Sequence, residues 1–212
     1  SIVECDVVDF NKLESIFDTY NFDIVFHNAA SKKNICLKNP PRDLEVNGTG
    51  TYNICELSSR YNVQKLVHAS TGSVYGEAEI LPQTEQHSLT PTSYYGVSKL
   101  AGDRYVKMYS DQRGLDATIL RYFHVFGSRQ EHDPELGGVV SIFIDRARKG
   151  LPLIIHGDGT QQRSFTHVDD IVGINLHVAC SPDSTGEVYN CASGVNVTVQ
   201  ELADFVRDKT NL

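Results

Sequence analysis

A tyrosine and a lysine four residues apart, Tyr95 and Lys99, are the side chains whose types and spacing could carry chemistry. On a helix, residues four apart share a face, so the phenol and the ammonium would be neighbours. A free tyrosine has a pKa of about 10 and is a poor base, but a nearby cation favours the phenolate. Lowering that pKa by ~3 units takes about 4 kcal/mol of differential interaction. The same spacing also occurs in pairs of exposed helix residues. The surrounding sequence therefore has to show whether Tyr95 and Lys99 form a catalytic pair.

Alternating sequence patterns predict a parallel α/β sheet around this pair. Short apolar runs that end in small or hydroxyl-bearing residues alternate with segments of helical periodicity. Such alternation indicates a parallel sheet covered on both faces, with ligands at the carboxyl ends of its strands. The predicted strands are 2–8 (with its exit loop), 23–27, 65–70, 116–126, 151–156 and 187–191. The predicted helices are 11–20 with Asn11 as cap, 42–61, 93–112, 139–148, 168–180, and one that Thr198 opens with Glu201 in a capping box.

We predict a Rossmann-type doubly wound sheet over residues 1–126. Residues 127–212 are expected to form a smaller, mostly substrate-binding α/β portion, interleaved with returning Rossmann elements at about 160–190. No glycine-rich turn of the kind that cradles a pyrophosphate occurs before Asp6. The chain is therefore expected to enter the sheet at about its third strand, to leave the sheet incomplete at its N-terminal edge, and to be a fragment of a longer protein.

Composition narrows the class of partner. The formal net charge is −8, which disfavours non-specific nucleic-acid binding but allows an anionic small ligand held by a few arginines. The five cysteines are scattered, without a C-x-x-C pair, so neither a metal site nor a disulfide framework is expected. No apolar run approaches the ~20 residues that cross a bilayer, and the first residues do not form a secretory signal. We expect a cytoplasmic protein with no membrane partner.

Several short motifs follow one another along essentially the whole chain. They are His27-Asn28-Ala29-Ala30, Asn47 in N-x-x-Gly50-Thr51, Ser70-Thr71 before Val74-Tyr75-Gly76, Tyr95-x-x-x-Lys99, Arg121-Tyr122-Phe123, and Gly157-Asp158-Gly159 leading to Arg163 through Asp170. In this order they resemble the extended short-chain dehydrogenase/reductase family, in particular its UDP-glucose 4-epimerase-like sugar-nucleotide epimerases and dehydratases. The resemblance implies a Rossmann-type fold, NAD as cofactor and a nucleotide-sugar, with UDP the expected nucleotide, as substrate.

The resemblance also implies residue roles. Tyr95 would be the acid/base, Lys99 would tune it and bind the nicotinamide ribose, and Thr71 would hydrogen-bond the reacting sugar oxygen. The implied cofactor-binding residues are Asp6, Val7, Asn28, Ala29, Ala30, Asn47, Ser70, Tyr95, Lys99, Tyr122 and Phe123. The implied substrate-binding residues are Thr71, Ser73, His124, His156 and Arg163, the arginine gripping the diphosphate.

Simpler interpretations remain for several of these residues. Asp6 could cap a turn, Asn47 could lie on a helix surface, and Tyr122 and Phe123 could be core residues. His156 could be a loop histidine exposed to solvent. His124 stands where related epimerases often carry asparagine, which puts that contact in doubt.

The two residues that directly follow Thr71 help to distinguish epimerisation from dehydration. Dehydratases of the resembled family typically place Asp-Glu there, because elimination needs a further acid/base pair, whereas this chain has Gly72 and Ser73. Epimerisation, at C4 of a UDP-hexose through a 4-keto intermediate, is therefore the expected reaction. The alternatives are an NAD(P)-dependent reductase or dehydratase, and a non-catalytic NAD(P)-binding sensor. The sugar and the choice between NAD and NADP stay open. The resemblance further implies a homodimer formed through helices 42–61 and 93–112.

Overall fold

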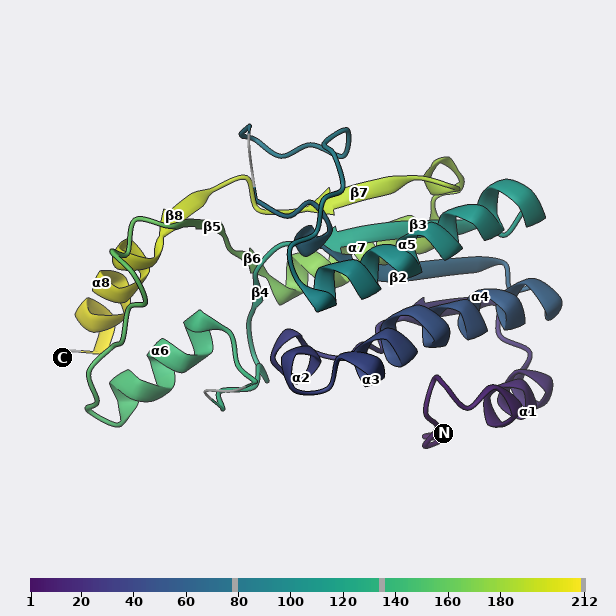
Figure 1. The fold of residues 1–212 in the computed structure, drawn as a ribbon, viewed down its shortest axis with the longest axis horizontal. Coiled ribbons are helices and arrows are strands. Elements are labelled where there is room, and N and C mark those ends of the chain that lie inside the picture. The colour runs from purple at the N-terminus through teal and green to yellow at the C-terminus, as the bar shows by residue number, and fades with distance from the viewer. Residues whose placement is uncertain (78–79, 134–135, 211–212) are drawn as a thin grey trace. The chain divides into compact units, whose positions relative to one another are not determined.

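A computed structural model describes residues 1–77, 80–133 and 136–210 of the chain. The polypeptide divides into two compact units (Figure 1). The first contains residues 1–121 and 174–190, and the second contains residues 122–173 and 191–212. The chain thus leaves the first unit after its third strand and returns to it within a helix.

The first unit is built on a four-stranded sheet in the order β1-β2-β3-β7. Strands β1 and β2 run parallel, with His27 opposite His68 at the carboxyl end of β1. The predicted parallel α/β architecture is confirmed, and the segment after each strand lies where a ligand would bind. The strands are β1 (Ile24–His27), β2 (Lys65–Thr71), β3 (Ala117–Tyr122) and β7 (Val188–Cys191).

The long helix α5 (Tyr94–Arg113) positions the predicted catalytic pair. Ser93 caps its first turn, since the hydroxyl oxygen accepts a hydrogen bond from the Gly96 amide at 3.1 Å. Gly114 ends it in a left-handed conformation with φ of 69°, which glycine adopts without strain. The other helical segments are α1 (Phe10–Tyr20), α2 (Lys33–Lys38), α3 (Pro40–Leu44), the π-helical turn η1 (Glu45–Thr49), α4 (Gly50–Arg60), the 3-10 turns η2 (Gly72–Val74) and η3 (Pro182–Ser184), and α7 (Val168–Cys180).

Three predictions about these elements are wrong. Helix α1 is capped by Asp9, whose carboxylate accepts from the Lys12 amide at 3.1 Å, whereas Asn11 lies inside the helix. Residues 2–8 and 151–156 form no strand. Apolar runs become strands only when a neighbouring strand supplies hydrogen bonds, and no described strand pairs with either segment.

An apolar core lies between the helices and the sheet of the first unit. Leu57 of α4 and Leu66 of β2 are fully buried, and Phe17 of α1 packs edge-on against Phe22. Burial of this kind contributes about 1.5–3 kcal/mol for each large side chain and fixes α5 against β2. The buried residues of this core are Leu13, Phe17, Ile54, Cys55, Leu57, Val63, Leu66, Val106, Tyr109, Leu115, Ala117 and Ile119.

The second unit has two small sheets and two packed helices. Strand β4 (Val125–Phe126) pairs in parallel with β6 (Thr166–His167), and β5 (Gln162–Ser164) pairs antiparallel with β8 (Asn196–Thr198). Helices α6 (Val139–Arg148) and α8 (Val199–Thr210) enclose a second core. The predicted capping box is confirmed, because the Glu201 amide donates to Thr198 Oγ1 at 3.0 Å and the Thr198 amide to Glu201 Oε2 at 2.7 Å.

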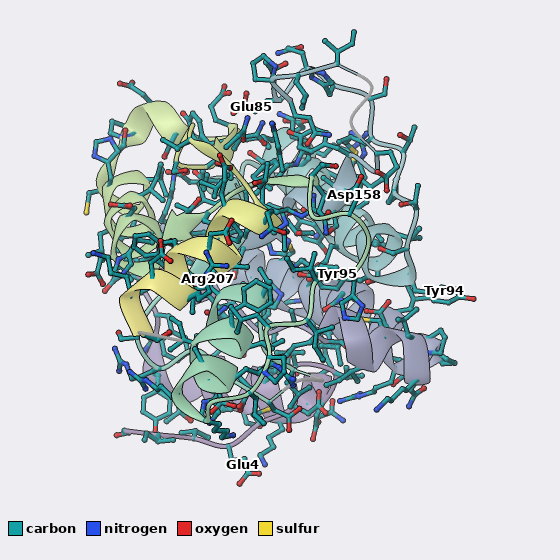
Figure 2. The ribbon with its side chains drawn as sticks, turned by 90° about the vertical axis from the view of Figure 1, so that its left-hand side faces the viewer. Glu4, Glu85, Tyr94, Tyr95, Asp158 and Arg207 are labelled. Atoms are coloured by element: carbon teal, nitrogen blue, oxygen red, sulfur yellow. The ribbon has the colours of Figure 1, made fainter. Side chains whose placement is uncertain are left out.

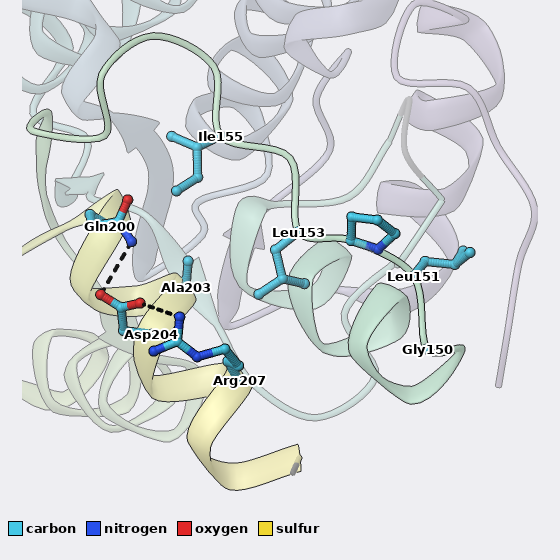
Figure 3. A pocket seen from close by; sticks show the side chains of 9 residues that line it. Gly150, Leu151, Leu153, Ile155, Gln200, Ala203, Asp204 and Arg207 are labelled. Carbon is cyan, nitrogen blue, oxygen red and sulfur yellow. Dashed lines mark hydrogen bonds and ion pairs between the residues drawn. The ribbon is translucent and has the colours of Figure 1, made fainter. Parts of the chain in front are cut away.

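A shallow hollow of about 390 Å³ lies between α8 and residues 150–155 (Figure 3). At its rim Asp204 accepts a hydrogen bond from Gln200 at 3.2 Å and forms an ion pair with Arg207 at 3.0 Å. These polar groups satisfy one another. Over the described residues, no helix has the length and apolar character needed to cross a bilayer.

Candidate active site

Tyr95 and Lys99 lie in the first two turns of α5, beside the carboxyl end of β2. Tyr94 is 58% exposed, whereas the neighbouring Tyr95 is half-buried and turned inward (Figure 2). The Tyr95 phenol lies beside the Thr71 side chain at the end of β2, and this interaction lowers the pKa of Tyr95. Thr71 Oγ1 also accepts from the Ser73 amide at 3.1 Å, which holds the threonine side chain in place. The predicted catalytic tyrosine and threonine are therefore in contact.

Burial controls the acidity of Tyr95. The pKa of Tyr95 is raised to about 12, chiefly by loss of solvent. The interaction with Thr71 lowers this pKa, and the charges of Cys36, Asp43 and Asp103 contribute to its rise. In the structure burial outweighs the Thr71 interaction, so the net shift of the pKa is upward. The lowering of this pKa by cations stays a prediction for the site with its ligands bound. Any activation of the phenol has to come from groups that bind there.

Lys99 is buried and remains hydrogen-bonded. Its ammonium donates to the carbonyl oxygen of Ala69 on β2 at 2.6 Å, and only 2% of the residue is exposed. Burial lowers the pKa of Lys99 to about 8, while the carboxylates of Asp103 and Asp43 act in the opposite direction. At neutral pH the ammonium is thus still mostly charged, one helical turn from Tyr95.

Asn47 is a buried member of the site, and its interpretation as a helix-surface residue is wrong. Its amide nitrogen donates to Asp43 Oδ1 at 2.7 Å and to Ser98 Oγ at 3.0 Å. Its amide oxygen accepts from the Ser31 backbone at 2.8 Å. Asn47 therefore links the segment that follows β1 to helix α5.

Asp103 and Arg121 are two further buried charged residues of the first unit. Asp103 was not named from the sequence, and Arg121 was named only within a motif, without a role. Arg121 Nε donates to Asp103 Oδ2 at 3.2 Å, and Arg121 Nη1 donates to the Tyr75 hydroxyl at 2.8 Å. His68 Nε2 lies 3.5 Å from Asp103 Oδ1, and burial lowers the pKa of this histidine to about 4. Asp103 follows Lys99 by four residues, so helical spacing was the signal that could have identified it.

The remaining residues of the first unit that the sequence assigned to a cofactor surround the same strand ends. Asn28, Ala29 and Ala30 are exposed directly after β1, and Ser70 is buried at the end of β2. Small exposed side chains leave the backbone of this segment accessible to a ligand.

Asp6 and Val7 are placed before α1. The Asp6 carboxylate accepts from the Val8 amide at 3.1 Å and pairs with Arg42, so it caps a turn, the simpler of its two interpretations. Val7 packs against Gly50, where an added Cβ would meet Val7 Cγ2 at 2.5 Å. Cofactor contacts of these two residues stay a prediction.

Five predicted site residues belong to the second unit. Tyr122 and Phe123 are half-buried, and the Phe123 amide donates to Cys191 O at 3.1 Å. His124 is exposed, with φ of 38° and its ring edge-on to Phe165. His156 and Arg163 are also exposed. Their assembly with Tyr95 stays a prediction.

Among the described residues, no group of three or more His, Cys, Asp or Glu side chains could hold a metal ion. The site consists of a phenol, an ammonium, hydroxyls and amides, buried around two carboxylates. Such groups can bind hydroxyls and phosphates and move a proton.

Comparison with known proteins identifies the family of the chain. The sequence matches the NAD dependent epimerase/dehydratase family over residues 1–192, and the chain belongs to this family. It is 38% identical over 207 residues to a putative UDP-glucose 4-epimerase of Methanocaldococcus jannaschii, covering 97% of this chain and 66% of that protein. The chain thus spans just under two thirds of that relative.

The fold of this chain is also similar to those of solved epimerase structures. The UDP-glucose 4-epimerase of Thermotoga maritima, determined with UDP-glucose, gives a TM-score of 0.94 at 33% identity, over 99% of this chain and 68% of that one. The UDP-glucose 4-epimerase of Thermus thermophilus in complex with NAD gives 0.89 at 32% identity, over 98% and 68%. The Rossmann-type fold expected from the sequence is confirmed.

Proposed function

We propose that the protein to which this chain belongs is an NAD-dependent epimerase acting at C4 of a UDP-hexose, with Tyr95 as the acid/base. The observation that carries the proposal is the contact between Tyr95 and Thr71, one helical turn from the buried ammonium of Lys99. A phenol, a hydroxyl and a cation at one sheet edge suit the removal of a proton from a sugar alcohol.

The residues present fit a dinucleotide. Lys99 and Tyr95 can bind ribose hydroxyls, and the exposed segment from Asn28 to Ala30 leaves its backbone open beside the strand ends. When bound, NAD supplies a hydride acceptor and a positively charged ring. Ser70, Asn47, Tyr122 and Phe123 are the further residues that we assign to this cofactor.

The chain's own residues then handle the proton. Bringing the Tyr95 pKa from about 12 to neutrality takes roughly 7 kcal/mol of differential interaction. The value of about 12 already includes the Thr71 interaction, so this difference has to come with the bound ligands. Tyr95 takes the proton of the C4 hydroxyl, holds it while the sugar is in its 4-keto form, and returns it to the C4 oxygen of the epimer. Thr71 keeps the reacting oxygen in line with Tyr95.

Gly72 and Ser73 favour epimerisation over dehydration, because neither offers the carboxylate that elimination needs. The Thermotoga maritima relative was determined with UDP-glucose, which supports a UDP-sugar substrate here. On the substrate side we assign Thr71 and Ser73 to the sugar, and His124, His156 and Arg163 to the nucleotide diphosphate and its surroundings. A guanidinium binds a diphosphate through two parallel hydrogen bonds.

The test compares the full-length protein with its Tyr95→Phe variant on a panel of UDP-sugars, with separation of the C4 epimers. We expect interconversion by the wild type and a loss of at least ~10³-fold in kcat for the variant, with substrate affinity little changed. Wild-type turnover by Tyr95→Phe would refute the role. Stoichiometric consumption of cofactor would indicate a reductase, and cofactor binding without turnover would indicate a sensor.

A homodimer is the second proposal for this protein, supported by an apolar face on α5. Val97, Tyr105 and Met108 are 53%, 47% and 43% exposed at helical spacing, and Tyr105 packs edge-on against Tyr52 of α4. Exposed apolar faces of this kind mark interfaces. Light scattering should give twice the chain mass, and Met108→Glu should give monomers. A monomeric wild type would exclude the dimer. We also propose a cytoplasmic location, which cell fractionation tests.

A further inference from the structure

We propose that Asp43 is a positioning residue of this site, one whose carboxylate fastens the segment after β1 to the helix that carries Tyr95. Asp43 lies on α3, outside the strands that end at the site. The role of Asp43 is to hold the residues of the site in place. Its activity readouts rest on the proposed function, and its structural readout does not.

The geometry is that of one oxygen shared by three donors from three elements. Asp43 Oδ1 accepts from Cys36 Sγ of α2 at 2.6 Å, from Asn47 Nδ2 of η1 at 2.7 Å, and from Ser98 Oγ of α5 at 3.0 Å. Only 1% of Asp43 is exposed, so water does not compete for these bonds. A fully satisfied buried network of this kind specifies one arrangement of the elements that it joins.

The network reaches both halves of the site. On one side, Ser98 stands between Tyr95 and Lys99 in the sequence, and its hydroxyl also donates to the Tyr95 carbonyl oxygen at 3.1 Å. On the other side, Asn47 Oδ1 accepts from the Ser31 amide, immediately after the exposed Asn28–Ala30 segment. Releasing Asp43 would therefore loosen the catalytic helix and the segment after β1 relative to each other.

The charge of Asp43 gives a second effect that a purely structural residue lacks. The negative charge of Asp43 raises the pKa values of both Tyr95 and Lys99. Removing the charge should lower both pKa values. The ionisable groups that face Tyr95 and Lys99 from the surrounding elements are Cys36 of α2, Asp43 of α3, Asp103 of α5, His27 of β1 and His68 of β2.

Two variants separate the effect of the hydrogen bond between Asp43 and Ser98 from the effect of the Asp43 charge. Asp43→Asn keeps the shape and one acceptor oxygen but removes the charge, whereas Ser98→Ala removes the bond to α5 and keeps the charge. The matched control is Asp116→Asn, because Asp116 pairs with Lys65 at 2.6 Å elsewhere in the same unit. All variants are made in the full-length protein and first checked for native circular dichroism.

The structural readout is amide hydrogen exchange at Ser31, which requires no activity. Asp43→Asn should speed exchange at this amide by about tenfold or more, while Asp116→Asn leaves it within twofold. Unchanged protection of Ser31 in Asp43→Asn would overturn the proposal, even in an enzyme with full activity. If Asp43→Asn does not fold, Ser98→Ala decides, through the loss of kcat described next.

The activity readouts use the wild-type epimerisation assay. Ser98→Ala should lower kcat by about tenfold with KM little changed and no shift in the pH profile. Asp43→Asn should also move the acidic limb of the kcat profile to lower pH, because the phenol loses its proton more readily. A normal kcat in Ser98→Ala, or an unmoved acidic limb in Asp43→Asn, would contradict the proposal. If the wild type does not epimerise, the proposed function fails, and Ser31 exchange still decides the role of Asp43.

Discussion

Replacing Lys99 by methionine should stabilise the protein at pH 7 while removing its activity. The ammonium of Lys99 is buried, and burial brings its pKa from an ordinary 10.5 to about 8. A native pKa below the unfolded one means that the native state binds fewer protons between these values, so stability rises with pH across the window. Keeping Lys99 charged in the folded state thus costs roughly 3 kcal/mol at pH 7 and roughly 1.4 kcal/mol at pH 9.5.

Methionine fills a similar volume without the charge. The variant loses the hydrogen bond to Ala69 O, worth about 1 kcal/mol, so the net gain in unfolding free energy at pH 7 is about 2 kcal/mol. At pH 9.5 the gain should nearly vanish. Urea unfolding of both proteins at the two pH values measures this, and subtracting one protein from the other cancels every other titrating group.

The result that would refute the reasoning is a difference between the two proteins that does not change with pH. Such a result would mean that Lys99 is as well solvated in the folded protein as in the unfolded chain. A variant destabilised by more than about 2 kcal/mol at pH 7 would equally contradict it, because packing would then outweigh the charge. Activity provides the second half of the prediction, since loss of the cation should lower kcat at pH 7 by at least ~10²-fold.

Three further substitutions test the surroundings of the pair. Thr71→Val removes the hydrogen bond to Tyr95 and should lower kcat about 10- to 100-fold in steady-state assays, and an unchanged kcat would contradict the role. Arg121→Met leaves the buried carboxylate of Asp103 unpaired and should cost about 3–5 kcal/mol in urea unfolding, whereas a loss below 1 kcal/mol would refute the pairing. Gly102→Ala places a Cβ 2.9 Å from Asn47 O and should cost about 1–3 kcal/mol in the same assay, with wild-type stability as the contrary result.

Elements with strong periodicity and clear end signals were predictable from the sequence. Helix α6 spans Val139–Arg148 and α7 spans Val168–Cys180, the bounds that the periodicity predicts. The predicted helix 42–61 is instead divided into α3, a π-helical turn and α4. A π turn depends on how Asn47 is held by its tertiary partners, which local periodicity does not contain.

The candidate site was predictable where the chemistry itself fixes the residues. Thr71 and Tyr95, to which the resemblance assigns catalytic roles, lie beside each other in the structure. The acidity of Tyr95 was not predictable, because burial depends on packing from several elements and the sequence shows only the nearest cation. Asp43 and Asp103 were also missed, since their roles arise from donors that are distant in sequence, such as Ser98 and Arg121.

Transfer of label from a substrate deuterated at C4 tests the central claim most directly. The full-length protein is incubated in ordinary water with a UDP-hexose carrying deuterium at C4, and the epimeric product is analysed by mass spectrometry and NMR. If Tyr95 moves only the hydroxyl proton and the C4 hydrogen travels as hydride, the product retains the deuterium at C4. Loss of that label to solvent, or undiminished turnover by Tyr95→Phe in the same assay, would contradict the account.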